Sequence, residues 1–382
     1  MIWIEELKEL KTKQMSEWKE YSLSEAVELI TGFPFKGDKY EMKGNLKVVR
    51  GENVTLGTLR WDSEKYWNHS TEDLEKYFLK TDDIVIGMDG SRVGQNRAII
   101  RTKELPLILA QRVARLRAKK NFDQKFIWYQ IYSKRFMDYV DAIQTGTSIP
   151  HISPSLINDF EISAPDYIEQ KAIAETISSL DDKIDLLHRQ NKTLEQLAET
   201  LFRQWFVEEV EESWEEVQLS DIVLVKYGKD HKKLGEGKIP AFGSGGLMRY
   251  VDTPLYTFES VLIPRKGTLN NVMYIDEPFW TVDTMFYTEM KKPNLAKFVY
   301  HFLKRLDLAS MNVGSAVPSM TTEVLNNMLL SIPSDEVFAE FELVVSECYQ
   351  KIKFNNKQIV TLTKLRDILL PKLMSGEVRI KN

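Results

Sequence analysis

Two long segments of the chain carry apolar residues at alternating intervals of four and three positions. This spacing is typical of the contact seam of a coiled coil, in which charged residues occupy the other positions. The first segment extends from Gln170 to Val207 and predicts a helix roughly 50 Å long, at about 1.5 Å per residue. Its seam residues are Ile173, Ile177, Leu180, Ile184, Leu187, Asn191, Leu194, Ala198, Leu201 and Trp205.

A second seam near the C-terminus has the same spacing, which favours pairing of the two helices. Its residues are Phe341, Val345, Cys348, Ile352, Asn355, Ile359, Leu362, Arg366, Leu369 and Leu373. One antiparallel register places Asn191 opposite Asn355, and a buried amide pair of this kind specifies register. The alternative is that both asparagines lie at a fraying edge. The same register sets these residues opposite one another: Leu187 and Ile359, Ile184 and Leu362, Leu194 and Ile352, Trp205 and Phe341. It also sets Leu180 against Arg366, whose charge must then reach solvent.

The chain also contains an internal repeat, which constrains the architecture more than any single element does. TGTSIPHISPSLIND at residues 145–159 matches VGSAVPSMTTEVLNN at residues 313–327, at an offset of 168 that continues through both predicted helices. The two unit starts, EWKEYSLSE from Glu17 and SWEEVQLSD from Ser213, match at an offset of 196. The second unit has therefore lost about 28 residues (196 less 168) in its middle, where the two sequences also diverge.

Each unit is predicted to be a small α/β domain. Runs such as DIVIG, VARLRA, SVLIP and DTMFYTE predict strands, and short helices are predicted over residues 124–140 and 295–306. Antiparallel helices would put one unit at each end, so the predicted fold has two similar domains related by pseudo-two-fold symmetry and joined by a long antiparallel two-helix coiled coil. The predicted divisions are a leader at residues 1–15, a first variable domain at 16–165, a central helix at 166–212, a second variable domain at 213–333, and a C-terminal helix and tail at 334–382.

Composition narrows the class of protein. The apolar fraction is 43%, which permits a sizeable core, and no run of eighteen apolar residues predicts a membrane span. The N-terminus does not have the pattern of a signal peptide. Cys348 is the single cysteine, which excludes an intramolecular disulfide and a cysteine-rich zinc site and indicates a reducing cytoplasm.

The distribution of charge matters more than its total. The net charge is −5, but residues 166–212 alone hold −7, so the rest of the chain holds +2. The stretch from Arg92 to Lys120 has nine basic residues and one acidic residue. Such a stretch can bind phosphate in a protein that is acidic overall, although a solvated surface is the alternative.

Side chains suited to contacts with a nucleic acid occur in both halves of the chain. In the major groove arginine distinguishes guanine and asparagine or glutamine distinguishes adenine, whereas Lys, Arg, Ser and Thr hold phosphates. In a strand, Arg115 and Arg117 would share one face and form a basic surface over an apolar underside. The candidates in the first half are Ser91, Arg92, Gln95, Asn96, Arg97, Gln111, Arg112, Arg115 and Arg117. Those in the second half are Lys232, Lys233, Arg265, Lys266, Thr268, Asn270 and Asn271, so the two halves carry unlike sets of side chains.

No catalytic group is predicted in this chain. There is no GxxxxGK[ST] phosphate loop and no Asn-Pro-Pro or Asp-Pro-Pro run, and GSGG at residues 243–246 does not fit the dinucleotide-binding pattern. The five histidines lack the spacing of metal ligands, so no metal site is expected.

A family resemblance is carried by three stretches: the closing LRDILLPKLMSGEVRI (Leu365–Ile380), the junction PDYIEQKAIAETISSLDDKI (Pro165–Ile184) and the unit start EWKEYSLSE. Together with the repeat layout, they resemble the specificity subunit of type I restriction–modification enzymes from about Glu17 onward. The first fifteen residues have no place in that pattern.

The resemblance implies a non-catalytic subunit whose two target-recognition domains each read one half of a bipartite DNA site, with the coiled coil setting the spacing. Because the candidate side chains differ between the two halves of the chain, the site is expected to be asymmetric, with different half-sites. It further implies two methyltransferase (modification) subunits that methylate adenine, and restriction subunits that translocate and cleave. S-adenosylmethionine, ATP and Mg²⁺ would therefore be bound by the partners, and no cofactor is expected here. Two alternatives are a coiled-coil adaptor for two protein partners and a detached specificity segment of a single-chain enzyme. The second needs a methylase region, for which 382 residues leave no room.

Overall fold

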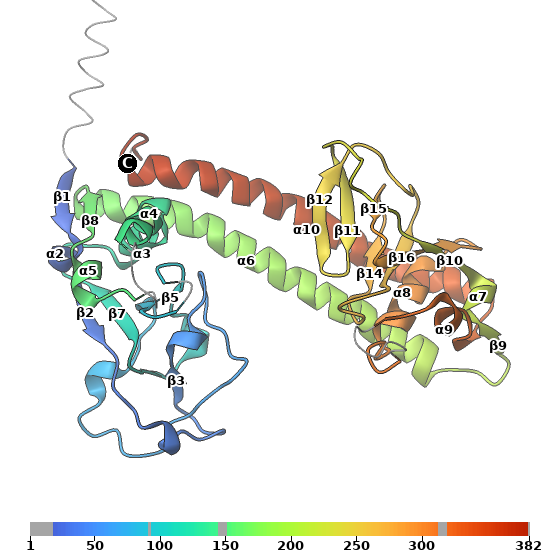
Figure 1. The fold of residues 1–382 in the computed structure, drawn as a ribbon, viewed down its shortest axis with the longest axis horizontal. Helices are drawn as coiled ribbons and strands as arrows, with labels where there is room; N and C mark the ends of the chain where they lie inside the picture. The colour runs from blue at the N-terminus through green and yellow to red at the C-terminus, as the bar shows by residue number, and fades with distance from the viewer. Residues whose placement is uncertain (1–17, 91–92, 144–150, 312–318, 381–382) are drawn as a thin grey trace, which may run out of the picture. The chain divides into compact units, whose positions relative to one another are not determined.

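The computed structural model describes residues 18–90, 93–143, 151–311 and 319–380 (Figure 1). These residues form two compact units. The first unit comprises the described residues up to Asp185 and those from Gln358 onward, and the second unit is Leu186–Lys357. The predicted leader at residues 1–15 lies outside the described residues, as do the repeated Gly-Pro stretches at residues 145–150 and 313–318.

The first unit is built around a four-stranded antiparallel sheet. Its strand order is β2 (Val27–Thr31), β7 (Val113–Ala118), β4 (Ile84–Gly87) and β5 (Arg97–Ile99). Two smaller sheets pair β1 (Lys19–Ser22) with β8 (Glu161–Ala164), and β3 (Lys47–Val49) with β6 (Leu107–Leu109). The helices are α2 (Leu23–Ala26), α3 (Gln124–Tyr132), α4 (Lys134–Ile143) and α5 (Pro154–Asn158), with 3-10 turns at Gly37–Lys39, Gly51–Asn53, Glu75–Tyr77 and Thr102–Glu104.

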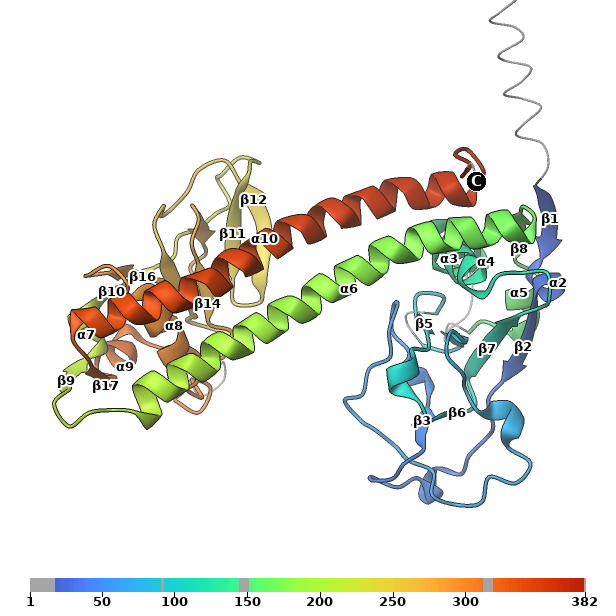
Figure 2. The same ribbon diagram turned by 180° about the vertical axis from the view of Figure 1, so that it is seen from behind.

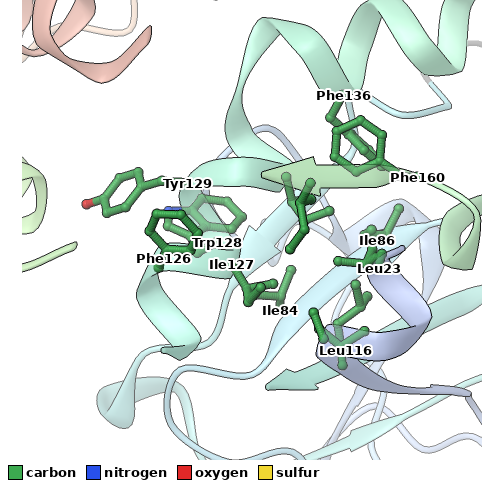
Figure 3. Close-up of a cluster of buried hydrophobic side chains, with 14 of the residues drawn as sticks. Leu23, Ile84, Ile86, Leu116, Phe126, Ile127, Trp128, Tyr129, Phe136 and Phe160 are labelled. Atoms are coloured by element: carbon green, nitrogen blue, oxygen red, sulfur yellow. The ribbon is translucent and has the colours of Figure 1, made fainter. Parts of the chain in front are cut away.

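The main sheet of the first unit has a buried core on each face. Because side chains alternate along a strand, Leu116 of β7 points to one face and Arg115 to the other. The Leu116 face packs on α3, whose Phe126 and Ile127 are fully buried (Figure 3). The start of this helix is fixed by the side chain of Asp123, which accepts a hydrogen bond from the backbone N–H of Phe126 at 2.9 Å. The opposite face is covered by residues of β3 and β6 and by Val54, Leu59 and Leu79.

The second unit repeats this plan. Its main sheet has the order β10 (Val223–Tyr227), β16 (Met285–Met290), β13 (Ser260–Pro264) and β14 (Met273–Ile275). The other sheets are β12 (Gly246–Val251), β11 (Ile239–Gly243) and β15 (Trp280–Thr281), and β17 (Leu329–Ile332) with β9 (Glu215–Gln218). The helices are α7 (Leu219–Ile222), α8 (Ala296–Lys304) and α9 (Thr322–Asn326), and a π-helical turn at Gln204–Glu208 precedes β9.

Strand registers show where the second unit is shorter. The offset between equivalent residues is 196 from β2 to β10, 177 from β4 to β13, 172 from β7 to β16 and 168 from β8 to β17. About nineteen of the 28 lost residues (196 less 177) therefore correspond to the segment between β2 and β4 of the first unit. The first unit uses this extra length for the loops that surround β3.

Two glycines follow the equivalent strands β2 and β10 because the backbone passes too close for a side chain. A Cβ atom at Gly32 would lie 2.1 Å from the carbonyl oxygen of Ala110, and one at Gly228 would lie 2.0 Å from that of Val282. The two units therefore keep the same close crossing although the residues around it differ.

Two long helices contribute to both units. They are α6 (Tyr167–Arg203) and α10 (Asp335–Met374), and within each unit their segments run side by side (Figures 1 and 2). The start of α6 and the end of α10 enter the core of the first unit, whereas the end of α6 and the start of α10 enter that of the second. Every predicted seam position is buried or half-buried, which confirms the heptad interpretation. Nowhere in the described parts of the chain is a helix long and apolar enough to cross a bilayer.

The predicted contact between Asn191 and Asn355 is present in the second unit. The Nδ2 of Asn355 donates to the Oδ1 of Asn191 at 2.8 Å, and the Nδ2 of Asn191 donates to the Oδ1 of Asn356 at 2.8 Å. Asn355 is fully buried, so neither asparagine lies at a frayed edge. The predicted pair of Trp205 and Phe341 is also in contact, with ring centroids 5.9 Å apart.

Arg366, the charged residue at a seam position that was expected to extend into solvent, forms an ion pair instead. Its guanidinium does not depend on solvent alone, because its Nη1 donates to the Oδ1 of Asp181 on α6 at 3.0 Å. The same carboxylate accepts a hydrogen bond from the hydroxyl of Tyr129 at 2.8 Å. A charge at a seam position is thus paired within the first unit.

The second unit contains a buried histidine with a strongly altered pKa. His301 on α8 is 4% exposed, its Nε2 lies 2.9 Å from the hydroxyl of Tyr349, and its ring is stacked on Phe202. Burial, with a smaller contribution from Lys304, lowers the pKa of His301 to about 3. The side chain is therefore neutral at physiological pH.

We expect the free energy of unfolding of the second unit to fall as the pH decreases below about 6. The unfolded chain binds a proton at His301 near pH 6.5, whereas the folded chain does so only near pH 3, so this group removes about 1.4 kcal/mol per pH unit between them. Urea unfolding of the protein and of His301→Gln at several pH values measures the difference. His188→Gln, at an exposed position, is the control. Equal pH slopes for all three proteins would contradict the assignment.

Candidate nucleic-acid interface

An open cleft in the first unit brings together several of the predicted DNA-binding residues. Gln111 and Arg112 form the turn between β6 and β7, and Asn96 precedes β5 on the other side of the cleft. Gln111 and Arg112 are exposed and Asn96 is half-buried. The lining residues are Phe35, Gly37, Tyr40, Arg50, Gly51, Glu52, Asp89, Gly90, Asn96, Ala110, Gln111 and Arg112.

Arg50 and Tyr40 are cleft residues that sequence reasoning missed. The Nη2 of Arg50 donates to the backbone oxygen of Ser63 at 2.9 Å and pairs with Glu52, and the guanidinium lies 5.6 Å from the ring centroid of Tyr40. An arginine held beside an aromatic ring can contact phosphate or base without losing its orientation. The only signal in the sequence was its place between an apolar run and Gly51, in VVRGEN.

Arg112 is held at the mouth of the cleft by a carboxylate. Its Nε lies 3.2 Å from the Oδ2 of Asp89, and the Oδ1 of Asp89 is bonded to the ring of His151. The backbone of Arg112 is left-handed, with φ 66°, a conformation that is uncommon for a residue other than glycine. The side chain is 73% exposed, so its remaining N–H groups are accessible to another partner.

The expectation for Arg97 is corrected by its burial. It is 3% exposed, its Nη2 donates to the backbone oxygen of Tyr132 at 2.8 Å, and its guanidinium lies 5.5 Å from the ring centroid of that tyrosine. Burial lowers the pKa of Arg97 to about 10. Its guanidinium joins β5 to α3 and is not presented to a ligand.

The predicted basic face is corrected at Arg115, because the layer around β3 and β6 covers this residue. Arg115 is 1% exposed, and burial lowers its pKa. Arg117 makes a two-point pair with Asp83, at 2.6 and 2.7 Å, and Asp83 is itself 2% exposed. Arg115 is therefore not presented to a ligand, whereas Arg117 is half-buried and held by Asp83.

The predicted residues of the second unit are more exposed. Lys232, Lys233, Lys266 and Thr268 are all exposed. The Nη2 of Arg249, a residue that sequence reasoning missed, fixes the loop of Lys232 and Lys233 by donating to two of its backbone oxygens, at 2.7 and 3.0 Å.

Three other predicted residues of this unit already have partners. Arg265 lies 5.4 Å from the ring centroid of Tyr227 and donates to the backbone oxygen of Asp283 at 3.2 Å. The amide of Asn270 bonds to Asp307 and to the backbone N–H of Ala309, and Asn271 donates to Ser244. The two asparagines therefore stabilise loops.

Ser91 and Arg92 lie outside the described residues, and Gln95 is exposed beside the cleft. In the described parts of the chain, no group of three or more His, Cys, Asp and Glu residues is placed to hold a metal ion.

Comparison with known proteins shows the family to which the chain is similar. The model of the family described as "Type I restriction modification DNA specificity domain" matches residues 15–196 and 211–363. The type I restriction enzyme MjaIX specificity subunit of Methanocaldococcus jannaschii is 25% identical over 319 residues, which cover 72% of this chain and 74% of that protein. The MjaVIII specificity subunit of the same organism is 23% identical over 354 residues, covering 81% and 82% of the two chains.

A solved structure shares the fold. The crystal structure of the type I restriction–modification system S subunit from M. genitalium superposes with a TM-score of 0.67 at 21% sequence identity, covering 93% of this chain and 96% of that one. The family model matches both repeats and most of the sequence. The chain therefore belongs to the family of type I restriction modification DNA specificity domains.

Proposed function

We propose that this chain, the DNA sequence-recognition subunit of a type I restriction–modification system, reads a bipartite asymmetric site with its two units, each unit reading one half. In this proposal the paired helices α6 and α10 set the spacer and carry two methyltransferase subunits. Methylation of adenine from S-adenosylmethionine, and ATP- and Mg²⁺-dependent translocation and cleavage by restriction subunits, are reactions of the partners. The chain supplies recognition and no chemistry, and the assembly acts in the cytoplasm, where its DNA is.

One observation carries the proposal: the two units have the same strand order but different exposed polar residues. The first unit has Gln111, Arg112 and Asn96 at an open cleft. The second unit has a fixed loop with Lys232 and Lys233. A duplicated scaffold with unlike side chains suits two tasks of one kind on two targets, because function resides in loops on a rigid frame.

The long helices support the proposed spacing role. A buried asparagine pair favours one register over others, since any shift leaves amides unpaired among apolar residues. In this proposal, a fixed register holds α6 and α10 in one alignment.

The same helices carry a repeated exposed stripe, which we assign to docking of the methyltransferase subunits. Leu186 and Leu197 on α6 are 37% and 47% exposed, and their repeat equivalents on α10, Phe354 and Leu365, are 54% and 43% exposed. Each pair is eleven residues apart, about three helical turns, and so lies on one face. Gln190 and Thr193 between the leucines recur as Gln358 and Thr361. A surface kept alike in both repeats suits a partner that binds in two copies.

The alternative function is a coiled-coil adaptor that binds two protein partners, and measurements of DNA binding distinguish it from the proposed function. We expect Gln111→Ala with Asn96→Ala to weaken preference for one half-site by about 30-fold or more, because two base contacts are lost and each bidentate contact is worth about 1–3 kcal/mol. Preference at the other half-site should be unchanged. The measurement is competition binding of the assembled complex to duplexes that vary in each half-site, at several salt concentrations.

The outcomes distinguish the two functions. Binding through phosphates should fall steeply with salt for every variant. An adaptor would show neither this salt dependence nor a preference among duplexes. Equal losses at both half-sites would contradict independent reading by the two units.

A further inference from the structure

The residue that directly follows β4 in the first unit and β13 in the second makes the same backbone hydrogen bonds in both units. In the first unit, the backbone N–H of Met88 donates to the carbonyl of Arg112 at 2.9 Å, and the carbonyl of Met88 accepts from Ile152 at 2.9 Å. In the second unit, the equivalent Arg265 donates to Thr284 at 2.8 Å and accepts from Met320 at 2.9 Å. A glycine with positive φ follows two residues later in each case, at 107° and 87°. We call this arrangement the strand-end frame.

The side chains on this frame are reversed in charge between the units. In the first unit the next residue after Met88 is Asp89, and in the second unit the next residue after Arg265 is Lys266. On the facing turn, Gln111 and Arg112 of the first unit correspond to Asp283 and Thr284 of the second. The arginine thus comes from the turn in one unit and from the strand end, as Arg265, in the other.

The two arginines are oriented by different neighbouring groups. Arg112 is held by Asp89, 3.2 Å away, whose other oxygen is bonded to His151. Arg265 lies over the ring of Tyr227 and donates to the backbone oxygen of Asp283 at 3.2 Å. Neither arrangement uses all five N–H donors of a guanidinium, so each arginine retains donors for a ligand.

We propose that Arg112 and Arg265 each read a guanine, one in each half-site, and that Asp89 positions Arg112 for this contact. The inference rests on the proposed function and adds the base and the residues. A guanidinium oriented by a carboxylate or a ring presents two parallel N–H groups, which match the O6 and N7 acceptors of guanine in the major groove. Because the two arginines leave the frame from opposite sides, the two guanines occupy different places relative to their units.

Asp89 is a positioning residue in this account, because it acts through Arg112. Its side chain is 27% exposed, and both carboxylate oxygens have partners, Arg112 on one and His151 on the other. Its loss should therefore weaken the choice of guanine without removing the positive charge that attracts DNA. Arg112→Lys is the complementary change, since it keeps the charge but loses the planar pair of donors.

The test is selection of duplexes with randomised half-sites by the full chain assembled with its methyltransferase subunits, followed by sequencing of the bound DNA. Arg112→Ala and Arg112→Lys should both reduce preference for one guanine in one half-site by at least tenfold. Asp89→Asn should reduce preference for the same guanine, and Arg265→Ala that for a guanine in the other half-site. Lys120→Ala, at an exposed basic position outside the cleft, is the matched control. Thermal unfolding verifies that each variant is folded.

Three results are distinguishable. If Arg112→Lys keeps the full preference and Arg112→Ala weakens all sequences equally, Arg112 contacts phosphate and the inference is overturned. If the variants keep specific binding with unchanged preferences, the inference also fails, but the proposed function stands. If the unaltered assembly shows no preference among duplexes, the proposed function itself fails.

Discussion

Insertion of four residues into each long helix, after Asn191 in α6 and before Asn355 in α10, is expected to change the spacer of the recognised DNA and leave the half-site bases unchanged. Four residues add about 6 Å of helix, and base pairs are stacked about 3.4 Å apart, so the permitted spacer should grow by one or two base pairs. Binding to the original site should weaken by about 10²- to 10⁴-fold, because the two units can no longer engage both halves together. A panel of duplexes that differ only in spacer length measures this.

Insertion in both helices preserves the antiparallel partners on either side, which an insertion in one helix would not. The single-helix insertion is therefore a useful comparison, and we expect it to destabilise the helix pair and bind every spacer poorly. An unchanged spacer in the double insertion would show that the helices do not set the distance. A change in the preferred bases would show that they take part in base reading.

Leu197→Glu and Leu365→Glu are each expected to release one methyltransferase subunit, and the double variant is expected to release both. Each leucine lies on the exposed stripe shared by the two helices, and a carboxylate there must be desolvated on docking. We expect the affinity for the affected copy to fall by about 30-fold or more, as for a central interface residue. Native mass spectrometry gives the stoichiometry of each complex directly.

Lys192→Glu is the matched control, because it places the same carboxylate on an exposed part of α6 away from the stripe. It should leave two subunits bound. Loss of both subunits from either single variant would contradict two equivalent docking sites. Retention of both subunits in the double variant would remove the stripe from the interface.

Patterns local to a helix predicted the long elements well. The seam positions from Ile173 to Leu373 recur with a fixed period, so burial of one face follows from spacing alone. The facing of Asn191 and Asn355 could be predicted for the same reason, because only a few registers align two polar interruptions. The repeat is also seen in local structure: Ser153 and Thr321 match at the offset of 168, and each caps its helix by accepting a hydrogen bond from a backbone N–H at 3.2 Å.

Contacts between distant segments could not be predicted from the same sequence. The alternation around Arg115 is that of a half-exposed strand, but the layer around β3 covers this face. Arg97 lies in a loop-like run of polar residues, yet its partners Tyr132 and Phe136 are more than thirty residues away. Arg112 and Asn96 were predicted from residue type, whereas Arg50 directly follows β3 and is brought to the cleft by contacts that the sequence does not reveal.

The most direct test of the account is to map the methylated adenines in DNA treated with the chain assembled with its methyltransferase subunits. The account predicts one bipartite sequence with two unlike half-sites, separated by a spacer of fixed length and free base composition. A single continuous site, two identical half-sites, or methylation without sequence preference would contradict it.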